Sequence, residues 1–304
     1  MTGILGVYRR WPTREACIQH LERVRWGDSP TCPYCASDKI SRHREALRDD
    51  RWQCQGCKRS FSVTVGTIFH KSHIDLQRWF LLISLMMAAK KGLSSMQAAR
   101  DLEMRQPTVW SMMHRVRAAM VDDGDLLRGV VEMDETFVGG KPRKANRRDD
   151  DPPGGQGVTA KEPVLGAVER GGRIKMRAVS RDMLTVGHLN RAIREMVATK
   201  GTILTTDEFG GYAHANGIVA HRTINHSIEF VRDDLFRSQF GRVHTNTIES
   251  AWAILKRAVY GQFHHVSRRY LPLYLNEIVH RYNARRSKDA FAGVLHLAVK
   301  PLTA

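Results

Sequence analysis

The sequence has few cysteines and no long hydrophobic run, and both features restrict the class of protein to which it can belong. None of its apolar stretches approaches the roughly 18 residues of a membrane-spanning helix, since the run at residues 79–89 stops at Lys90. The first residues lack a signal-peptide pattern because arginines interrupt them. A phosphate-binding P-loop and a serine or cysteine nucleophile pattern are also missing, so nothing predicts ATP dependence. We therefore expect a cytoplasmic protein with no membrane segment.

Acidic residues are scarce relative to basic ones. The 304 residues include 48 Lys and Arg against 31 Asp and Glu, which gives a formal net charge of +17. The hydrophobic share of 42% is ordinary for a globular chain, so wholesale disorder is not expected. The charge excess predicts an anionic partner, and nucleic acid is the commonest one. The alternative is a basic surface with no specific ligand.

Four of the five cysteines form two Cys-x-x-Cys pairs separated by 18 residues. Each pair makes a sharp knuckle that directs two thiolates at one ion, so the spacing predicts a closed, structural zinc site rather than two redox pairs. The predicted ligands are Cys32, Cys35, Cys54 and Cys57. Cations and aromatics around them favour contact with DNA phosphates, with a solvated basic hairpin as the alternative. Cys17 lies on the apolar face of a helix predicted over 13–25 and is expected in a core.

The next segment has helical periods. Residues 75–92 predict a buried helix, and residues 93–120 predict a helix, a tight turn and a second helix that begins near Pro107. In the second helix a polar and cationic set is expected to face outward and enter a DNA groove. The alternative is a core helix rich in Met and Trp. The outward set comprises Ser111, His114, Arg115 and Arg117, and we expect His114 and Arg115 to contact DNA.

From about residue 129 the pattern becomes mixed α/β. Strands and helices alternate with Gly-rich turns, and two long amphipathic helices follow. The segment 141–161 has no periodicity and is crowded with charge, Pro and Gly, which predicts a mobile loop. Strands are predicted within 129–140, 162–172, 173–180 and 202–212, and helices within 185–198, 244–261 and 267–285.

Two aspartates stand in apolar strands. Asp134 lies within one strand and Asp207 at the end of another, positions where an acid is costly unless it is paired or bound to a cation. Each alone could instead be satisfied by a backbone amide. Strand alternation places Glu132 on the face of Asp134 and Glu135 on the opposite face.

A later helix carries a polar stripe. Helical spacing places Asn246, Glu249 and Lys256 on one side, so the helix could direct Glu249 at the two aspartates with Lys256 near a phosphate. The opposite side is expected to pack on the sheet through Ile248, Trp252, Leu255 and Val259. Three nearby histidines are expected to be surface residues or phosphate contacts rather than metal ligands: His244, His264 and His265.

Several segments together resemble the insertion-sequence transposases that carry an N-terminal zinc ribbon, a branch of the DDE transposases and integrases. The resemblance extends from the cysteine knuckles to about residue 286. It implies an RNase H-like catalytic domain in which Asp134 and Asp207 bind Mg²⁺, or alternatively Mn²⁺, and Glu249 completes the triad. It also implies that Lys256 contacts DNA. Some relatives carry Asn where Glu is expected, so Asn246 is either a second DNA contact or shares the third-ligand role. The matching segments read MDETFVGGK, TTDEFGGY, HTNTIESAWAILKRAVYGQFHHVS and YLNEIVHRYNAR.

The resemblance implies an α+β multidomain transposase that binds terminal inverted repeats and target DNA as a dimer or larger assembly. Two other functions stay open: a metal-dependent nuclease without strand transfer, and a non-catalytic zinc-ribbon DNA-binding regulator. The expected parts are an N-terminal helical segment (1–28), the zinc ribbon (29–72), a helix-turn-helix-like segment (73–125), the RNase H-like domain (126–290) and a C-terminal tail (291–304).

Overall fold

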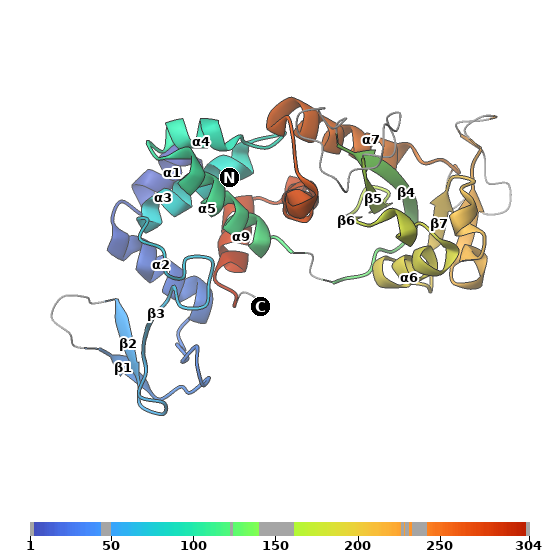
Figure 1. Cartoon of the computed structure of the whole chain (residues 1–304). Helices are drawn as coiled ribbons and strands as arrows, with labels where there is room; N and C mark the ends of the chain where they lie inside the picture. The colour runs from blue at the N-terminus through green and yellow to red at the C-terminus, as the bar shows by residue number, and fades with distance from the viewer. Residues whose placement is uncertain are drawn as a thin grey trace. The chain divides into compact units, whose positions relative to one another are not determined.

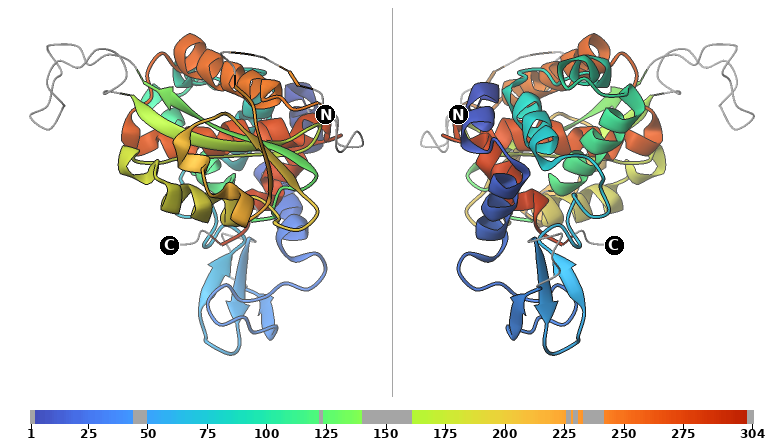
Figure 2. Two further views of the ribbon diagram at one scale, coloured as in Figure 1. Left: turned by 90° about the vertical axis from the view of Figure 1, so that its right-hand side faces the viewer. Right: turned by 90° about the vertical axis from the view of Figure 1, so that its left-hand side faces the viewer.

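The chain forms two compact units in a computed structural model (Figures 1 and 2). The first comprises Met1–Val121 with Ala284–Ala304, and the second Asp122–Asn283. No helix in the described parts of the chain is long and apolar enough to cross a membrane. The loop predicted at 141–161 falls outside the described residues except for Lys161. The structure describes residues 3–43, 50–121, 124–139, 161–225, 228, 231–232 and 242–301.

A small three-stranded sheet carries the cysteine knuckles. Its strands β1 (Ile40–Arg42), β2 (Arg51–Cys54) and β3 (Ser60–Ser62) are antiparallel in the order β1-β2-β3. The rings of Trp26 and Phe61 meet edge to face in its core, with centroids 6.0 Å apart. Strands this short bury little apolar surface, so the module depends on further cross-linking of the kind that a metal supplies.

Helices make up the rest of the first unit. Thr13 caps α2 (Arg14–Trp26) by accepting the backbone N–H of Ala16, and Ser94 caps α4 (Ser95–Asp101) in the same way. Cys17 is buried in the core, as predicted. The helices are α1 (Ile4–Arg10), α2 (Arg14–Trp26), α3 (Leu76–Ala88), α4 (Ser95–Asp101), α5 (Gln106–Ala119) and α9 (Ala290–Ala298).

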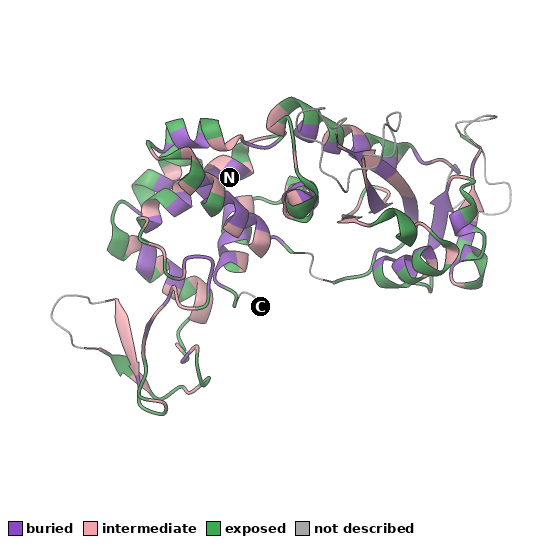
Figure 3. Ribbon diagram, viewed as in Figure 1, coloured by how far each residue is buried: buried purple, intermediate pink, exposed green. Residues whose placement is uncertain are grey.

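The C-terminal segment differs from the tail expected at 291–304. Residues 290–298 form α9, whose apolar side (Phe291, Val294 and Leu295) is buried in the same core as α3 and α5 (Figure 3). The second unit correspondingly ends at Asn283 rather than at residue 290. The physical reason is the i, i+3, i+4 spacing of these apolar residues, which needs a partner surface. The other domain boundaries stay predictions.

A five-stranded mixed sheet forms the centre of the second unit. The strand order is β6-β5-β4-β7-β8, with β5 antiparallel to β4 and β6, and with β4, β7 and β8 parallel. This is the sheet of an RNase H-like domain, so the expected fold class is confirmed. The strands are β4 (Val130–Val138), β5 (Glu162–Glu169), β6 (Ile174–Ala178), β7 (Ile203–Thr206) and β8 (Ala220–Thr223). Only β8 was not foreseen, because its sequence AHRT is short and polar.

Helices cover both faces of this sheet. Helix α6 (Val186–Met196) packs on the face that carries Val131 and Met133. Helices α7 (Asn246–Lys256) and α8 (Leu271–Asn283) pack on the other face, and a π-helical stretch (Arg257–Phe263) continues α7 (Figure 1). The odd residues of β4 therefore face α6 and the even ones face α7. Short 3₁₀ turns lie at Arg181–Met183, Gly210–Tyr212, Ala215–Gly217, Arg268–Tyr270 and Ala284–Arg286.

The packing of α9 predicts that it is required for the stability of the first unit. We expect Phe291→Ala to destabilise that unit by about 3–5 kcal/mol, because it removes a fully buried aromatic side chain. Denaturant unfolding followed by circular dichroism measures the change. His296→Ala on the exposed side of α9 is the control. Equal stabilities of the two variants would mean that α9 is dispensable.

Candidate metal centres

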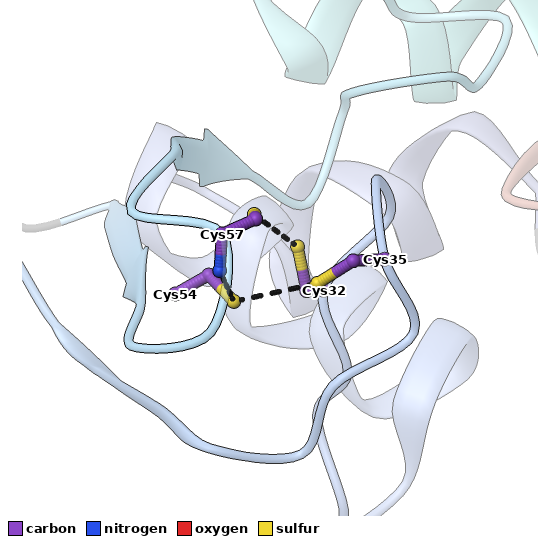
Figure 4. Close-up of side chains that lie close together, drawn as sticks. All are labelled: Cys32, Cys35, Cys54 and Cys57. Carbon is purple, nitrogen blue, oxygen red and sulfur yellow. Dashed lines mark hydrogen bonds between the residues drawn. The ribbon is translucent and has the colours of Figure 1, made fainter.

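The four knuckle cysteines converge on one point (Figure 4). The Sγ atoms of Cys32 and Cys57 lie 3.7 Å apart, and those of Cys35 and Cys54 lie 3.6 Å apart. A tetrahedron with Zn–S bonds of about 2.3 Å has edges of about 3.8 Å, so the thiols fit zinc. The backbone N–H of Cys57 donates to the Sγ of Cys54 at 3.4 Å, and this bond, with further hydrogen bonds from the neighbouring thiols and Gly56, lowers the pKa of Cys54 to about 6. The four sulfurs occupy all the positions of a tetrahedral site, as a structural site requires.

Backbone conformation explains how each knuckle turns. Ala36 and Lys58, which directly follow the second cysteine of each pair, have φ values of 59° and 58°. This left-handed conformation is uncommon for residues other than glycine and reverses the chain around the sulfurs. The two knuckles therefore share one geometry although their sequences differ.

Three carboxylates gather where β7 ends. Oxygens of Asp134, Glu135 and Asp207 lie within 4.8 Å of one another. The register pairs Glu132 with Thr205, and β7 stops one residue later, at Thr206. Asp207 therefore emerges level with Asp134 beside the open edge of β4. Parallel strands bring both aspartates to the same edge, as the sequence predicted.

Glu135 is a correction to the reasoning from strand alternation. It does lie on the face opposite Asp134, where its Oε2 accepts the hydroxyl of the fully buried Tyr212 at 3.0 Å. Its carboxylate nevertheless belongs to the cluster, because none of the described strands pairs with β4 on this side past the end of β7. Alternation assigns a face, but it does not exclude contact around an open edge.

Burial and mutual repulsion make this cluster unfavourable without a cation. Burial raises the pKa of Asp134 to about 6, and the charges of Asp207 and Glu249 add to the shift, while a hydrogen bond from Trp252 opposes it. Burial and the charges of Asp134 and Asp207 raise the pKa of Glu135 to about 7. Divalent ions with oxygen preference would relieve this repulsion, so the donor set fits Mg²⁺ or Mn²⁺.

Trp252 fixes the orientation of Asp134. Its indole Nε1–H donates to Oδ2 of Asp134 at 2.7 Å. The ring lies over Gly166, the partner of Asp134 on β5, and a Cβ added at that glycine would stand 2.4 Å from the indole. A glycine is therefore needed opposite Asp134 so that the indole can reach it.

Hydrogen bonds also hold the chain at Asp207. The backbone N–H of Phe209 donates to Oδ1 of Asp207 at 3.1 Å. The hydroxyl of Thr206 donates to the carbonyl oxygen of Asp207 at 2.7 Å and lies 2.9 Å from Nε2 of His221 on β8. Both the backbone and the carboxylate of Asp207 are thus restrained.

The polar stripe of α7 lies as predicted. Asn246, Glu249 and Lys256 are exposed, whereas the apolar side is buried against the sheet through Ile248, Trp252, Leu255 and Val259. Among the described residues, the group of acids within 4.8 Å does not include Glu249, although its charge raises the pKa of Asp134. Its role as the third ligand, and the DNA contacts of Asn246 and Lys256, stay predictions.

The outward face predicted for α5 is wrong at two positions. Arg117 is 1% exposed and His114 is 8% exposed, and His114 stacks on Trp110 with ring centroids 4.0 Å apart. Arg115 is half-buried, lies over the ring of Trp79 and donates to the carbonyl oxygen of His70. The order of helix, turn and helix is present, but α5 is largely a core helix because its Met side chains are buried in the core. In this arrangement only Ser111 of the predicted set is exposed.

The sequence reasoning missed the role of Glu132. This side chain is 0% exposed and binds the N-terminal end of α7 and the guanidinium of Arg170. The available signal was the one that singled out Asp134, namely an acid inside an apolar strand.

The cysteine site predicts that each chain binds one zinc ion. We expect Cys54→Ser to lose the metal and unfold the ribbon, because binding free energy at such sites is folding free energy. Metal analysis of the purified protein and limited proteolysis measure the two effects. Cys17→Ala, which changes a buried cysteine outside the site, should keep its zinc. Zinc retained by Cys54→Ser would contradict the site.

The raised pKa of Asp134 predicts a stabilising substitution. The carboxyl binds its proton more tightly when folded than at its ordinary pKa of 3.8, so ionisation costs stability as pH rises from 3.8 to about 6. Asp134→Asn should raise the Tm of the protein without added divalent ions at pH 8, and the gain should vanish below about pH 4. Thermal scans across pH measure it. Asp125→Asn, an exposed acid of the same unit, should show little change; a destabilised Asp134→Asn at pH 8 would disprove the expectation.

Comparison with known proteins agrees with this geometry. The profile of the ISXO2-like transposase domain matches residues 126–283, and that of the transposase zinc-ribbon domain matches residues 12–60. An uncharacterized protein in transposable element ISH50 of Halobacterium salinarum is 24% identical over 250 residues, which is 78% of this chain and 80% of that protein.

Solved structures give weaker likenesses. The pre-cleavage Mos1 transpososome matches with 12% identity over 71% of this chain and 74% of that chain, at a TM-score of 0.28. The Mos1 strand transfer complex matches with 13% identity over 72% and 74%, at a TM-score of 0.29. Scores this low establish no common fold, so the sequence profiles decide the family. Because the transposase-domain profile covers more than half of the chain, the protein belongs to the ISXO2-like transposase family.

Proposed function

We propose that this transposase cleaves the ends of its element and joins the resulting 3′-hydroxyl to target DNA in a reaction that requires Mg²⁺. The observation that carries the proposal is the convergence of Asp134 and Asp207 at the open edge of β4, held by Trp252 and by the turn after β7. The family and the relative from a transposable element support it.

The carboxylates of Asp134, Asp207 and a third acid would hold the divalent ions. Such ions would supply Lewis-acid stabilisation of the attacking and leaving oxygens. In the first step water attacks the phosphorus and the 3′-oxygen leaves; in the second, the freed 3′-hydroxyl attacks a target phosphodiester and the 3′-oxygen of the target strand leaves. Trp252 keeps the Asp134 carboxylate in one orientation throughout. Asn246 and Lys256, exposed on α7, would bind the DNA backbone beside the cleavage point.

Two residues are candidates for the third acid. Glu249 matches the family pattern and stands on α7, from where its charge raises the pKa of Asp134. Glu135 is the member of the observed cluster, and its raised pKa shows a carboxyl that gains by binding a cation. We favour Glu249, because it stands at the position where the family pattern has its third acid.

The zinc ribbon would bind element ends. Lys58 and Arg59 are exposed at the second knuckle, and the guanidinium of Arg59 lies 4.7 Å from the ring of the exposed Tyr34. A cationic and aromatic surface of this kind suits a phosphate backbone. Joining also requires two ends to be held together, so a dimer or larger assembly on DNA belongs to the proposal.

A joining assay tests the function. Purified protein is incubated with labelled DNA ends that carry the inverted repeats flanking its coding region, a target plasmid and Mg²⁺. We expect joined products from the wild type and a loss of more than about a hundredfold in Asp207→Asn, since outer-shell changes alone cost 10–100-fold. Glu208→Gln, the exposed neighbour, is the control.

Each other result selects a different function. Cleavage without joined products would indicate a nuclease, and DNA binding with no chemistry by the wild type would indicate a regulator. Glu135→Gln and Glu249→Gln in the same assay identify the third ligand, because only its loss should match Asp207→Asn.

A further inference from the structure

A third carboxylate of β4 is buried outside the cluster of acids. Glu132 stands two residues before Asp134, on the same face, and is 0% exposed. An isolated buried carboxylate is strongly unfavourable, so the surroundings of this one must compensate for its charge. Its partners come from two places: the N-terminal end of α7 and Arg170, which follows β5.

The backbone of α7 supplies the first set of donors. The N–H groups of Thr247 and Ile248 donate to Oε2 of Glu132 at 2.8 and 3.0 Å, and the hydroxyl of Thr247 donates to Oε1 at 2.9 Å. Backbone N–H groups in the first turn have no partner within their own helix, and they favour negative charge. Glu132 therefore caps α7 from the neighbouring strand.

This cap replaces the usual one. Thr245 stands at the N-cap position of α7, yet its side chain makes no capping bond. Its hydroxyl instead donates to Oε1 of Glu249 at 3.2 Å. Because Glu132 satisfies the helix end, Thr245 is left to orient the acid that we propose as the third ligand.

Arg170 fixes the approach to the helix. Its Nε donates to Oε1 of Glu132 at 2.7 Å, and its terminal nitrogens donate to the carbonyl oxygens of Arg242 and His244 at 2.5 and 2.9 Å. The Nδ1 atom of His244 lies 3.2 Å from Oε1 of Glu132. One ion pair thus ties β4, the end of β5 and the segment that precedes α7.

We propose that Glu132 is a positioning residue for the metal site, which fixes the N-terminus of α7 on β4 so that Glu249 and Trp252 stand at set positions relative to Asp134. The inference rests on the proposed function, in which Glu249 binds the metal. Glu132 is fully buried and lies outside the cluster of acids, so it would act through the helix. Outer-shell residues of this kind commonly change metal affinity by about 10–100-fold when they are replaced.

Glu132→Gln is the informative variant, because it keeps the shape of the side chain. Its amide offers one acceptor and one donor group, so it cannot accept from both α7 and Arg170. Thr245→Val is its partner: it leaves the cap intact and removes only the hydroxyl on Glu249. Glu195→Gln makes the same chemical change in an exposed ion pair on α6 and serves as the control.

Two measurements on the full-length, zinc-loaded protein test the inference without an assay of catalytic activity. Hydrogen exchange at the backbone of residues 245–256 reports the cap, and Mn²⁺ binding measured by electron paramagnetic resonance reports the carboxylate site. We expect Glu132→Gln to exchange faster in this segment and to bind Mn²⁺ about tenfold or more weakly. Thr245→Val should weaken Mn²⁺ binding with little change in exchange, and Glu195→Gln should change neither.

Other outcomes overturn the inference. A Glu132→Gln protein that melts earlier but binds Mn²⁺ like the wild type would show a purely structural ion pair. Unchanged exchange in α7 would show that Glu132 does not hold the helix. If Glu132→Gln does not fold, Thr247→Val removes one bond to the same carboxylate, and a lack of shift in both measurements would equally refute the role. A wild type that binds no Mn²⁺ and joins no DNA would refute the proposed function, and the exchange data would still decide the cap.

Discussion

Crowding of carboxylates at the open edge of β4 is the constraint on which the second unit depends. Asp134, Glu135 and Asp207 repel one another and are partly withdrawn from water, so this place is unfavourable for the empty protein and favourable for a divalent cation. Much of the surrounding structure restrains these groups. Functional sites commonly lower the stability of the folded protein in this way.

The restraints come from three layers. In the sheet, Gly166 makes room for the indole of Trp252, which then reaches Asp134. On one face, Tyr212 engages Glu135. On the other face, Glu132 holds α7 by its N-terminus. Each layer uses a residue inside an otherwise apolar core, where a hydrogen bond that is lost cannot be replaced by water.

Much of this could be predicted from particular residues. The cysteine spacing identified the zinc module, and the 3.6-residue period of α7 placed Trp252 inward and Glu249 outward. The same reasoning was wrong for α5, because it predicted that the charged residues of this helix are exposed. His114 and Arg117 are buried. Helical periodicity alone does not decide which side of a Met-rich helix packs into the core, so it did not predict their burial. The sequence analysis also predicted a tail after residue 290 and did not predict α9. This helix is short, and its apolar side is recognisable only together with the core into which it packs.

The sequence by itself determined the ligand chemistry: four thiols in two knuckles, one aspartate within a strand and another at a strand end, and an amphipathic helix with an acid on its outer side. These are local patterns, set by spacing along the chain. Tertiary structure alone decided that Glu135 joins the cluster, that Glu132 caps a helix more than a hundred residues away, and that Gly166 gives Trp252 its place. Such contacts depend on where β7 ends and on how two distant segments meet across the sheet. No spacing within a single segment encodes them.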